Sequence, residues 1–291
     1  MPDLKLSLAS PAETAAPAET AAPLRTVEMG DYRRVAFLGG IYSNYIALRE
    51  ALRMARERRV DAVFALGDFG AFGPHPDRTL ELLRGEGIPA IQGNYEESLA
   101  SSAEDCHCGY TDPRDNHFAQ ISYDYTRDRT AAEHKRWMGT LPGHIRLTIG
   151  GRRVLLCHGS PRRINEFLWR SMTPEPFLRK LLRDFETDLV VSTHTGLHWS
   201  RFVEPGRGIV NCGALGRPAN DGRTNVWFAI VEAADDGLRA DLVPVDYDHE
   251  RLAREMRSEG LPDEFVETIR TGWWTSCLEV LPAKERAAGR Y

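Results

Sequence analysis

The chain has 291 residues, of which 42% are apolar and 27% are charged, a composition typical of a soluble globular protein. Its net charge of -5 is small and the charges are interspersed, which disfavours nucleic acid and anionic membranes as partners. No apolar run approaches the roughly 20 residues that span a bilayer, and the N-terminus lacks a secretory signal, so we expect a cytoplasmic protein.

Composition divides the chain into three parts. Residues 1–31 include "PAETAAPAETAAP", which has no apolar periodicity, and we predict a disordered N-terminal tail. Residues 32–248 are expected to form one domain. Residues 249–291 are expected to form a mostly helical C-terminal extension that packs on this domain.

The first half of the domain reads as successive β-α units. "RRVAFLGG" predicts a strand, "NYIALREALRMARERR" an amphipathic helix and "VDAVFALGD" a second, buried strand. "PDRTLELLRGEG" predicts a helix and "IPAIQGN" another short strand. "DCHCGYTDPRDNHFAQISYDYT" is polar and is expected to be irregular, before a helix around "RDRTAAEHKRWMGTL".

The second half contains hairpins. "HIRLTIGGRRVLLCHGSP" predicts a hairpin that turns at Gly150 and Gly151, and "TNVWFAIVEAADDGLRADLVPVDYD" predicts another around Asp236 and Gly237. Between them, "TPEPFLRKLLRDFE" predicts a helix, and "TDLVVSTH" and "GIVNCGALGRP" predict strands. Parallel units followed by hairpins indicate an α/β fold with a mixed sheet, or two sheets packed face to face with helices outside.

Polar side chains follow four of the predicted strands, namely Asp68, Asn94, His158 and His194. In open α/β sheets, ligands bind beyond the carboxyl ends of the strands. Oxygen and nitrogen donors of this kind suit a divalent metal such as Mn, Fe or Zn. Each residue alone is more often a turn, cap or satisfied polar residue than a ligand, so the metal site depends on their convergence.

Taken in order, the blocks "LGD", "QGN", "CHGSP" and "STHT" resemble those of the calcineurin-like metallophosphoesterases, which are written G-D, G-N-H, a lone His and G-H-x-H. "FGPHPDRTLELL", "HGSPRRINEFL" and "NCGALGRP" are also similar to this family, and the resemblance extends from about Arg33 to about Asp248. It implies an α/β sandwich of two mixed β-sheets flanked by helices, with the metal ions at the carboxyl edge.

The resemblance implies one complete metal half-site. In the family, two metals share the aspartate of G-D, and the ligands of one metal carry over onto Asp68, Asn94, His158 and His194. A divalent metal ion, Mn, Fe or Zn, is therefore the expected cofactor, with one or two ions per chain.

The other half-site departs from the family pattern. The family's ligands there are the Asp and His of D-x-H and the second His of G-H-x-H. In this sequence these positions are Gly40, Tyr42 and Gly196, so only the shared aspartate is kept. His198 is the candidate replacement, since a loop shift could turn its ring inward. Tyr42 could bind trivalent iron as a phenolate, but a hydrogen-bonded hydroxyl at the rim of the site is the preferred interpretation. Asn44 stands where the family places a polar, substrate-binding residue.

Several further residues are candidates for catalysis or substrate binding. Tyr95 replaces the family histidine that follows G-N and could donate a proton to the leaving group, although a phenol is a poor acid. Arg162 and Arg163 after "HGSP", and Arg217 in the glycine-rich loop, could balance phosphoryl charge, or they could be solvated surface residues.

The five cysteines are expected to be mostly reduced thiols. Cys157 precedes a predicted ligand and Cys212 lies in a loop expected beside the site, so either could ligate a metal or make it sensitive to oxidation. A buried structural thiol is the stronger alternative for Cys157. The spacing of Cys106 and Cys108 is too short for a typical zinc motif.

These observations favour a metal-dependent phosphoesterase that hydrolyses a phosphate ester with a metal-activated water. A non-hydrolytic metal-binding regulatory or sensor protein on the same fold is the alternative, and other metal chemistry on this scaffold is a third. The partner would be a small-molecule phosphate ester or a phosphoprotein. "GWW", at 272–274, could cover a hydrophobic edge or a partner chain, so a homo-oligomer stays open.

Overall fold

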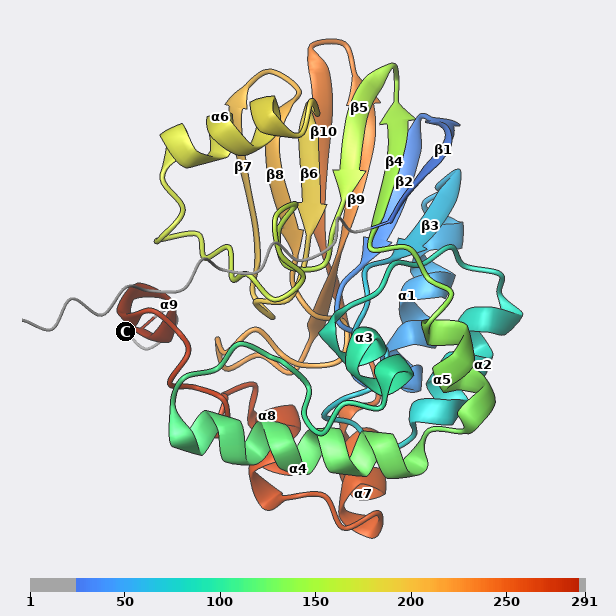
Figure 1. Cartoon of the computed structure of the whole chain (residues 1–291), viewed down its shortest axis with the longest axis vertical. Helices are drawn as coiled ribbons and strands as arrows, with labels where there is room; N and C mark the ends of the chain where they lie inside the picture. The colour runs from blue at the N-terminus through green and yellow to red at the C-terminus, as the bar shows by residue number, and fades with distance from the viewer. Residues whose placement is uncertain (1–24, 288–291) are drawn as a thin grey trace, which may run out of the picture.

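The structure, a computed structural model, describes residues 25–287. Its strands form two mixed sheets, and Figure 1 shows helices packed around them, so the predicted α/β sandwich is confirmed. The larger sheet contains, in pairing order, β1 (Thr26–Tyr32), β4 (His144–Ile149), β5 (Arg152–Leu156), β6 (Leu189–Ser192), β8 (Arg207–Cys212) and β7 (His198–Glu204). The smaller sheet contains β10 (Gly237–Val245), β9 (Val226–Ala234), β2 (Arg34–Leu38) and β3 (Ala62–Ala65).

Strand β2 shows how the layers are held together. Val35 and Phe37 point into the apolar core between the two sheets, whereas Ala36 and Leu38 point into the core beneath the helices. Successive strand residues face opposite sides of a sheet, so a strand that is buried on both faces must be apolar at every position. The continuous run "VAFL" therefore fits a strand between two layers.

Helices cover both outer faces and one end of the sandwich (Figure 1). They are α1 (Tyr45–Glu57), α2 (Pro76–Gly85), α3 (Asn94–Ser101), α4 (Pro113–Arg129), α5 (Ala132–Met138), α6 (Glu175–Asp184), α7 (His249–Ser258), α8 (Asp263–Thr271) and α9 (Ala283–Ala287). Helix α6 buries Leu178, Leu181 and Leu182 against the larger sheet. Within the described residues, no helix has the length and apolar character needed to cross a membrane.

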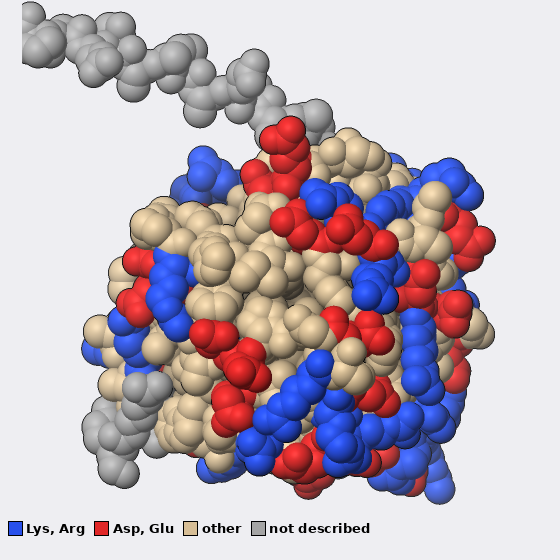
Figure 2. Space-filling view, turned by 90° about the horizontal axis from the view of Figure 1, so that it is seen from below, with Lys and Arg blue, Asp and Glu red and all other residues tan. Residues whose placement is uncertain are grey.

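The strand directions determine where a site can form. Strands β5, β6 and β8 are mutually parallel, and β2 and β3 are parallel in the other sheet. Their carboxyl ends point to the lower end of the molecule in Figure 1, where α4, α7 and α8 lie. Figure 2 views this end from below and shows Lys and Arg interspersed with Asp and Glu around a central uncharged area.

Several element predictions hold and several are wrong. The hairpins around Gly150 and around Gly237 are confirmed, as antiparallel pairs of β4 with β5 and of β9 with β10. The strand predicted at "IPAIQGN" is only an isolated bridge at Ala90. Strand β7, which was not predicted, pairs with β8, so the segment after Gly196 is part of the sheet.

The segment expected to be irregular before Arg127 is largely helical. Asp112 caps α4 by accepting hydrogen bonds from the N–H groups of Arg114 and Asp115, and Pro113 occupies the first turn. A capping aspartate followed by proline is a recognised helix start, and this signal was present in "TDPRD".

The boundary predicted for the N-terminal tail is also wrong in part. Residues 1–24 lie outside the described part of the chain. Strand β1 pairs in parallel with β4, so ordered structure begins before residue 32. The tail prediction failed there because an edge strand that is mostly exposed carries little apolar periodicity.

Candidate metal centre

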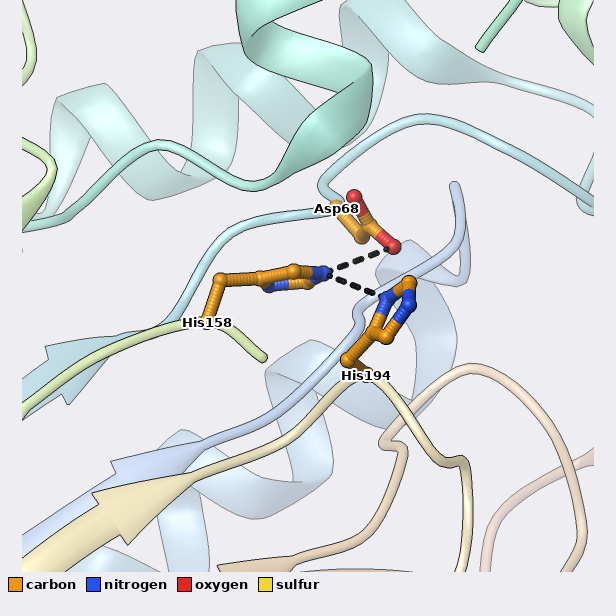
Figure 3. A group of neighbouring side chains, drawn as sticks. All are labelled: Asp68, His158 and His194. Carbon is orange, nitrogen blue, oxygen red and sulfur yellow. Dashed lines mark hydrogen bonds and ion pairs between the residues drawn. The ribbon is translucent and has the colours of Figure 1, made fainter. Parts of the chain in front are cut away.

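Three side chains from separate strand ends meet at the carboxyl edge of the two sheets (Figure 3). Asp68 follows β3, His158 follows β5 and His194 follows β6. Nε2 of His158 lies 3.2 Å from Oδ2 of Asp68 and 3.2 Å from Nδ1 of His194. All three side chains are buried, and one donor atom of each lies within 4.8 Å of the others. The structure thus brings together three of the four residues implied as ligands of one metal.

Asn94, the fourth implied ligand, is the first residue of α3 and lines the same cavity as Asp68 and His194. Its Nδ2 donates a hydrogen bond to the carbonyl oxygen of Cys106 at 2.8 Å. Its Oδ1 is buried and has no hydrogen-bond partner within the described part of the chain. The amide is therefore held by its nitrogen, and its oxygen is left free to bind a cation.

The loops that carry these residues are strained and are held by a buried carboxylate. Asp68 and His194 have positive φ angles of 55° and 65°, which are unfavourable for residues other than glycine. The Glu96 carboxylate accepts hydrogen bonds from the N–H groups of Asp68, Phe69 and Gly93, at 2.7 to 2.9 Å. Strained backbone held in this way is typical of functional sites.

Burial and mutual charge determine the protonation of the group. Burial would raise the pKa of Asp68, but the charge and hydrogen bond of His158 hold it below 3.8. Burial would lower the pKa of His158, but the Asp68 carboxylate raises it above 6.5. Burial, together with the charge of His158, lowers the pKa of His194 to about 3. Without a cation, the arrangement favours one carboxylate, one protonated imidazole and one neutral imidazole.

The orientation of His158 suits metal binding through Nε2. Its Nδ1 lies 2.6 Å from the carbonyl oxygen of Leu66, which can only accept, so Nδ1 carries the proton. Histidine ligands commonly donate their second ring N–H to a carbonyl or carboxylate in this way. When the ring is neutral, its Nε2 lone pair points at Asp68 and His194.

The donor set fits a divalent transition metal. Two imidazole nitrogens, a carboxylate oxygen and an amide oxygen are suitable ligands for Mn, Fe or Zn. A buried acceptor without a partner, such as Oδ1 of Asn94, is rare in folded proteins, and a cation at this position would satisfy it. The residues present therefore fit the cation that the sequence resemblance implies.

Aromatic rings stand beside two of the positions where the other half-site lacks ligands. A Cβ atom on Gly40 would lie 2.5 Å from Cε1 and Cζ of Tyr42. A Cβ atom on Gly196 would lie 3.0 Å from the ring of Trp274. Burial raises the pKa of Tyr42 well above its usual value, with a further contribution from Asp68, so the phenol keeps its proton. Neither glycine position has room for a ligand side chain without movement of its neighbouring ring.

A cavity of about 50 Å³ adjoins the candidate metal centre. Its wall includes Tyr42, Asp68, Asn94, Tyr95, Tyr110, His194, Arg217 and Cys277. The Tyr95 hydroxyl donates to Oγ of Ser122 at 2.9 Å, and burial raises the pKa of Tyr95 well above 10. Tyr95 and Arg217 thus lie where the sequence places them, but the Tyr95 hydroxyl already has a hydrogen-bond acceptor.

Two other predicted site residues have different roles in the structure. Arg162 is exposed and forms an ion pair with Glu166, and it does not line the cavity. Oδ1 of Asn44 accepts a hydrogen bond from the N–H of Ala47 at 3.0 Å and thereby caps α1. Neither residue contacts the candidate metal centre, so the roles predicted for them in catalysis and substrate binding have no support from the geometry.

His198 is not brought to the candidate metal centre. It is the first residue of β7, and its ring stacks on Trp227 with a centroid distance of 3.7 Å. Burial lowers the pKa of His198 to about 4. Residues 25–287 contain no second group of three His, Cys, Asp or Glu donors placed to share a metal. The pairing of β7 with β8 keeps His198 in the sheet and prevents the loop shift considered above.

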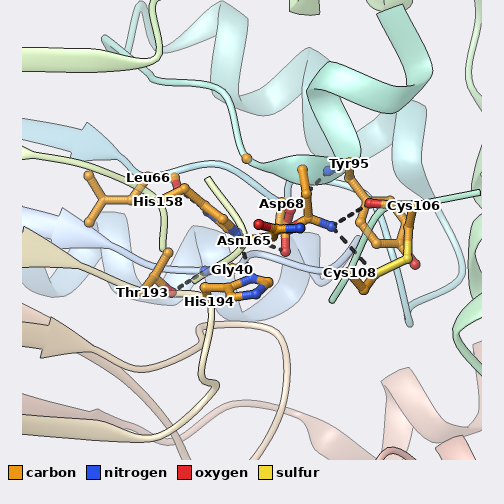
Figure 4. Close-up of polar contacts among 12 residues, drawn as sticks. Gly40, Leu66, Asp68, Tyr95, Cys106, Cys108, His158, Asn165, Thr193 and His194 are labelled. Carbon is orange, nitrogen blue, oxygen red and sulfur yellow. Dashed lines mark hydrogen bonds and ion pairs between the residues drawn. A yellow bond between two sulfur atoms is a disulfide. The ribbon is translucent and has the colours of Figure 1, made fainter. Parts of the chain in front are cut away.

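The cysteines depart in part from the expectation of reduced thiols. Cys106 and Cys108 form a disulfide, which is drawn in yellow in Figure 4. The Sγ atom of Cys108 accepts a hydrogen bond from Nδ2 of Asn94 at 3.4 Å. The free cysteines are Cys157, Cys212 and Cys277, all of which are buried. Burial raises the pKa of the Cys157 thiol, which favours the structural interpretation of that residue.

Three residues at the site were not identified from the sequence. Glu96 follows Gly93 by three positions, a capping-box spacing that could have been noticed. The Phe167 ring stacks on His194 at a centroid distance of 4.3 Å. Trp274 was noted only as a cover for an apolar edge. No local pattern connects Phe167 or Trp274 to the strand ends.

Comparisons with known proteins agree with this geometry. A family model described as a calcineurin-like phosphoesterase superfamily domain matches residues 34–236. An uncharacterized protein of Methanocaldococcus jannaschii is 22% identical over 250 residues, which cover 82% of this chain and 98% of that protein. The crystal structure of a metallophosphoesterase from Sphaerobacter thermophilus is 26% identical with a TM-score of 0.63, covering 83% of this chain and 99% of that one.

A hypothetical protein from Pyrococcus horikoshii has the same fold, with a TM-score of 0.70 at 20% identity, covering 85% of this chain and all of the other. The family match extends over well more than half of the sequence and includes all four implied ligands of the candidate metal centre. The chain therefore belongs to the calcineurin-like phosphoesterase superfamily.

Proposed function

We propose that the protein is a metal-dependent phosphoric ester hydrolase that uses one divalent metal ion, Mn, Fe or Zn. Asp68, Asn94, His158 and His194 would hold this ion. The observation that carries the proposal is the convergence of these buried side chains from separate strand ends, with Oδ1 of Asn94 left without a partner among the described residues. When bound, the ion would polarise a phosphoryl oxygen and lower the pKa of a coordinated water.

The chain supplies the remaining roles itself. The Leu66 carbonyl orients His158, and the N–H of Tyr95 orients the Asp68 carboxylate from 3.3 Å. Arg217 provides positive charge for a phosphoryl group in the cavity. Tyr95 keeps its proton but donates it in a hydrogen bond to Oγ of Ser122, so it is at most a weak general acid.

A non-hydrolytic binding or regulatory protein is the second candidate. The rings of Tyr42 and Trp274 stand where one metal's ligands would be, and Tyr95 takes the place of a family histidine. A protein with these changes could keep one metal for structure or sensing without turnover. For either candidate we propose a cytoplasmic protein whose partner is a small-molecule phosphate ester or a phosphoprotein, and a homo-oligomer stays open.

Metal analysis combined with a phosphatase assay tests the proposal. The protein is purified without added metal, its metal content is measured, and hydrolysis of p-nitrophenyl phosphate is followed for wild type, His158→Ala and His198→Ala. We expect one metal ion per chain and turnover in wild type and in His198→Ala, because His198 lies outside the centre. His158→Ala should lose both the metal and the turnover.

Two outcomes would contradict parts of this proposal. Metal binding with equally negligible turnover in wild type and His158→Ala would favour the non-hydrolytic candidate. Two metal ions per wild-type chain would refute the one-metal site and would require ligands that the described residues do not bring together.

A further inference from the structure

Arg217 is a buried cation that forms no ion pair with a carboxylate of the described residues, although Asp115 contributes a favourable charge from farther away. The residue is 7% exposed, and its Nη2 donates to the backbone carbonyl oxygen of Ser276 at 2.5 Å. Within residues 25–287, no carboxylate forms an ion pair with it, and its Nε has no hydrogen-bond partner. Burial lowers the pKa of Arg217 below its usual value, but an arginine stays protonated. A buried charge is unfavourable unless an opposite charge accompanies it, so an anion bound beside Arg217 would be stabilised.

Two aromatic rings hold the guanidinium in place. Its Cζ lies 3.8 Å from the ring centroid of Trp274 and 5.0 Å from that of Phe72. Trp274 is itself fixed, because its Nε1 donates to the carbonyl oxygen of Pro218 at 2.6 Å and its N–H donates to Oδ1 of Asn220 at 2.9 Å. Stacking uses the face of the guanidinium and leaves N–H groups at its edge for an acceptor.

This cation lies in the region that the incomplete half-site would occupy. Trp274, on which Arg217 stacks, is the ring that stands against Gly196. Tyr42, which stands against Gly40, lines the same cavity as Arg217 and Asp68. The sequence thus lacks the family's ligands for one metal, and the structure places one fixed positive charge in the cavity beside these positions.

We propose that Arg217 takes the place of the missing metal ion and binds the terminal phosphoryl group of a phosphomonoester. This inference rests on the proposed function, because the phosphoryl group bound by Arg217 would also contact the metal ion held at Asp68. A guanidinium binds phosphate oxygens through paired N–H groups, and a phosphomonoester dianion supplies the missing negative charge. The cavity of about 50 Å³ is small, which favours a phosphomonoester, with one organic substituent on the phosphoryl group, over a phosphodiester, which must place two.

Calorimetric titration with inorganic phosphate, methyl phosphate and dimethyl phosphate tests this inference without requiring turnover. The titrations use wild type, Arg217→Gln, Arg217→Lys and Arg223→Gln, each with Mn²⁺ and after removal of metal. Arg223 is the matched control, because its side chain is 71% exposed and lies outside the cavity.

We expect Arg223→Gln to bind each ligand with the same affinity as wild type. Both proteins should bind phosphate and methyl phosphate with similar affinity, and dimethyl phosphate at least about 10-fold more weakly. Arg217→Gln should weaken phosphate binding by about 10- to 100-fold with metal present. Arg217→Lys should weaken it by a smaller factor, because lysine keeps the positive charge but lacks the paired N–H donors. Circular dichroism of each variant verifies folding, and Arg217→Lys tests the inference if Arg217→Gln does not fold.

Three results would overturn the inference: no phosphate binding by wild type at millimolar concentration, equal binding by the Arg217 and Arg223 variants, or equal affinity for dimethyl phosphate. Binding that depends on Arg217 in a protein without turnover would refute only the hydrolase proposal. Turnover with phosphate binding that is independent of Arg217 would refute only the role of Arg217.

Discussion

The contact between Gly40 and Tyr42 can be tested by a double-mutant cycle. A Cβ atom at position 40 would lie 2.5 Å from two ring carbons of Tyr42, whereas ordinary contacts are 3.4 to 4 Å. In Gly40→Ala the ring must therefore move by about 1 Å, and overpacking of this kind costs about 1–3 kcal/mol of unfolding free energy. Tyr42→Ala removes the ring and costs about 3–5 kcal/mol, as for other large aromatic truncations.

The double variant distinguishes this contact from a general intolerance of substitution at Gly40. Without the Tyr42 ring, the added methyl group meets no ring atom, so Gly40→Ala should cost little in the Tyr42→Ala background. The coupling free energy should then be about 1–3 kcal/mol in favour of the double variant.

Urea denaturation of the four proteins, with metal removed, measures this coupling. Gly85→Ala is the control, because a Cβ there meets nothing within 4 Å at the end of α2, and it should leave stability unchanged or raise it by up to about 1 kcal/mol. Additive effects of the Gly40 and Tyr42 substitutions, within about 0.5 kcal/mol, would show that the ring does not occupy this space.

Three further predictions concern pH, the C-terminal segment and the disulfide. Burial lowers the pKa of His144 from 6.5 to about 4, so its contribution to stability is complete above pH 6.5 and is lost as the pH falls towards 4. Urea denaturation across this range should show a loss of stability that is about 3 kcal/mol smaller in His144→Gln than in wild type. The Asp115 carboxylate accepts hydrogen bonds from two backbone N–H groups of the C-terminal segment, so Asp115→Asn should destabilise by about 1–3 kcal/mol and speed proteolysis of that segment. Reducing the Cys106–Cys108 disulfide should weaken metal binding by about 10-fold or more in chelator competition, because both cysteines accept from Nδ2 of Asn94.

The residues of the candidate metal centre were largely readable from the sequence. Asp68, His158 and His194 each follow a short apolar run, and carboxyl ends of parallel strands meet at one edge of a sheet. Local periodicity predicts the strands, and the strands then place their end residues together. The prediction that His198 is a metal ligand was not supported, because His198 lies in β7. The pairing of β7 with β8 depends on tertiary packing and cannot be predicted from the local sequence pattern.

The residues that fill the other half-site could be recognised only in three dimensions. The sequence shows that Gly40 and Gly196 replace ligands, and so determines which metal position is altered. Only the tertiary structure places Trp274 against Gly196 and stacks Arg217 on its ring, since these contacts join the C-terminal segment to loops far away in the chain. Periodicity reports which face of an element is buried, whereas packing between distant segments decides which side chains share a cavity.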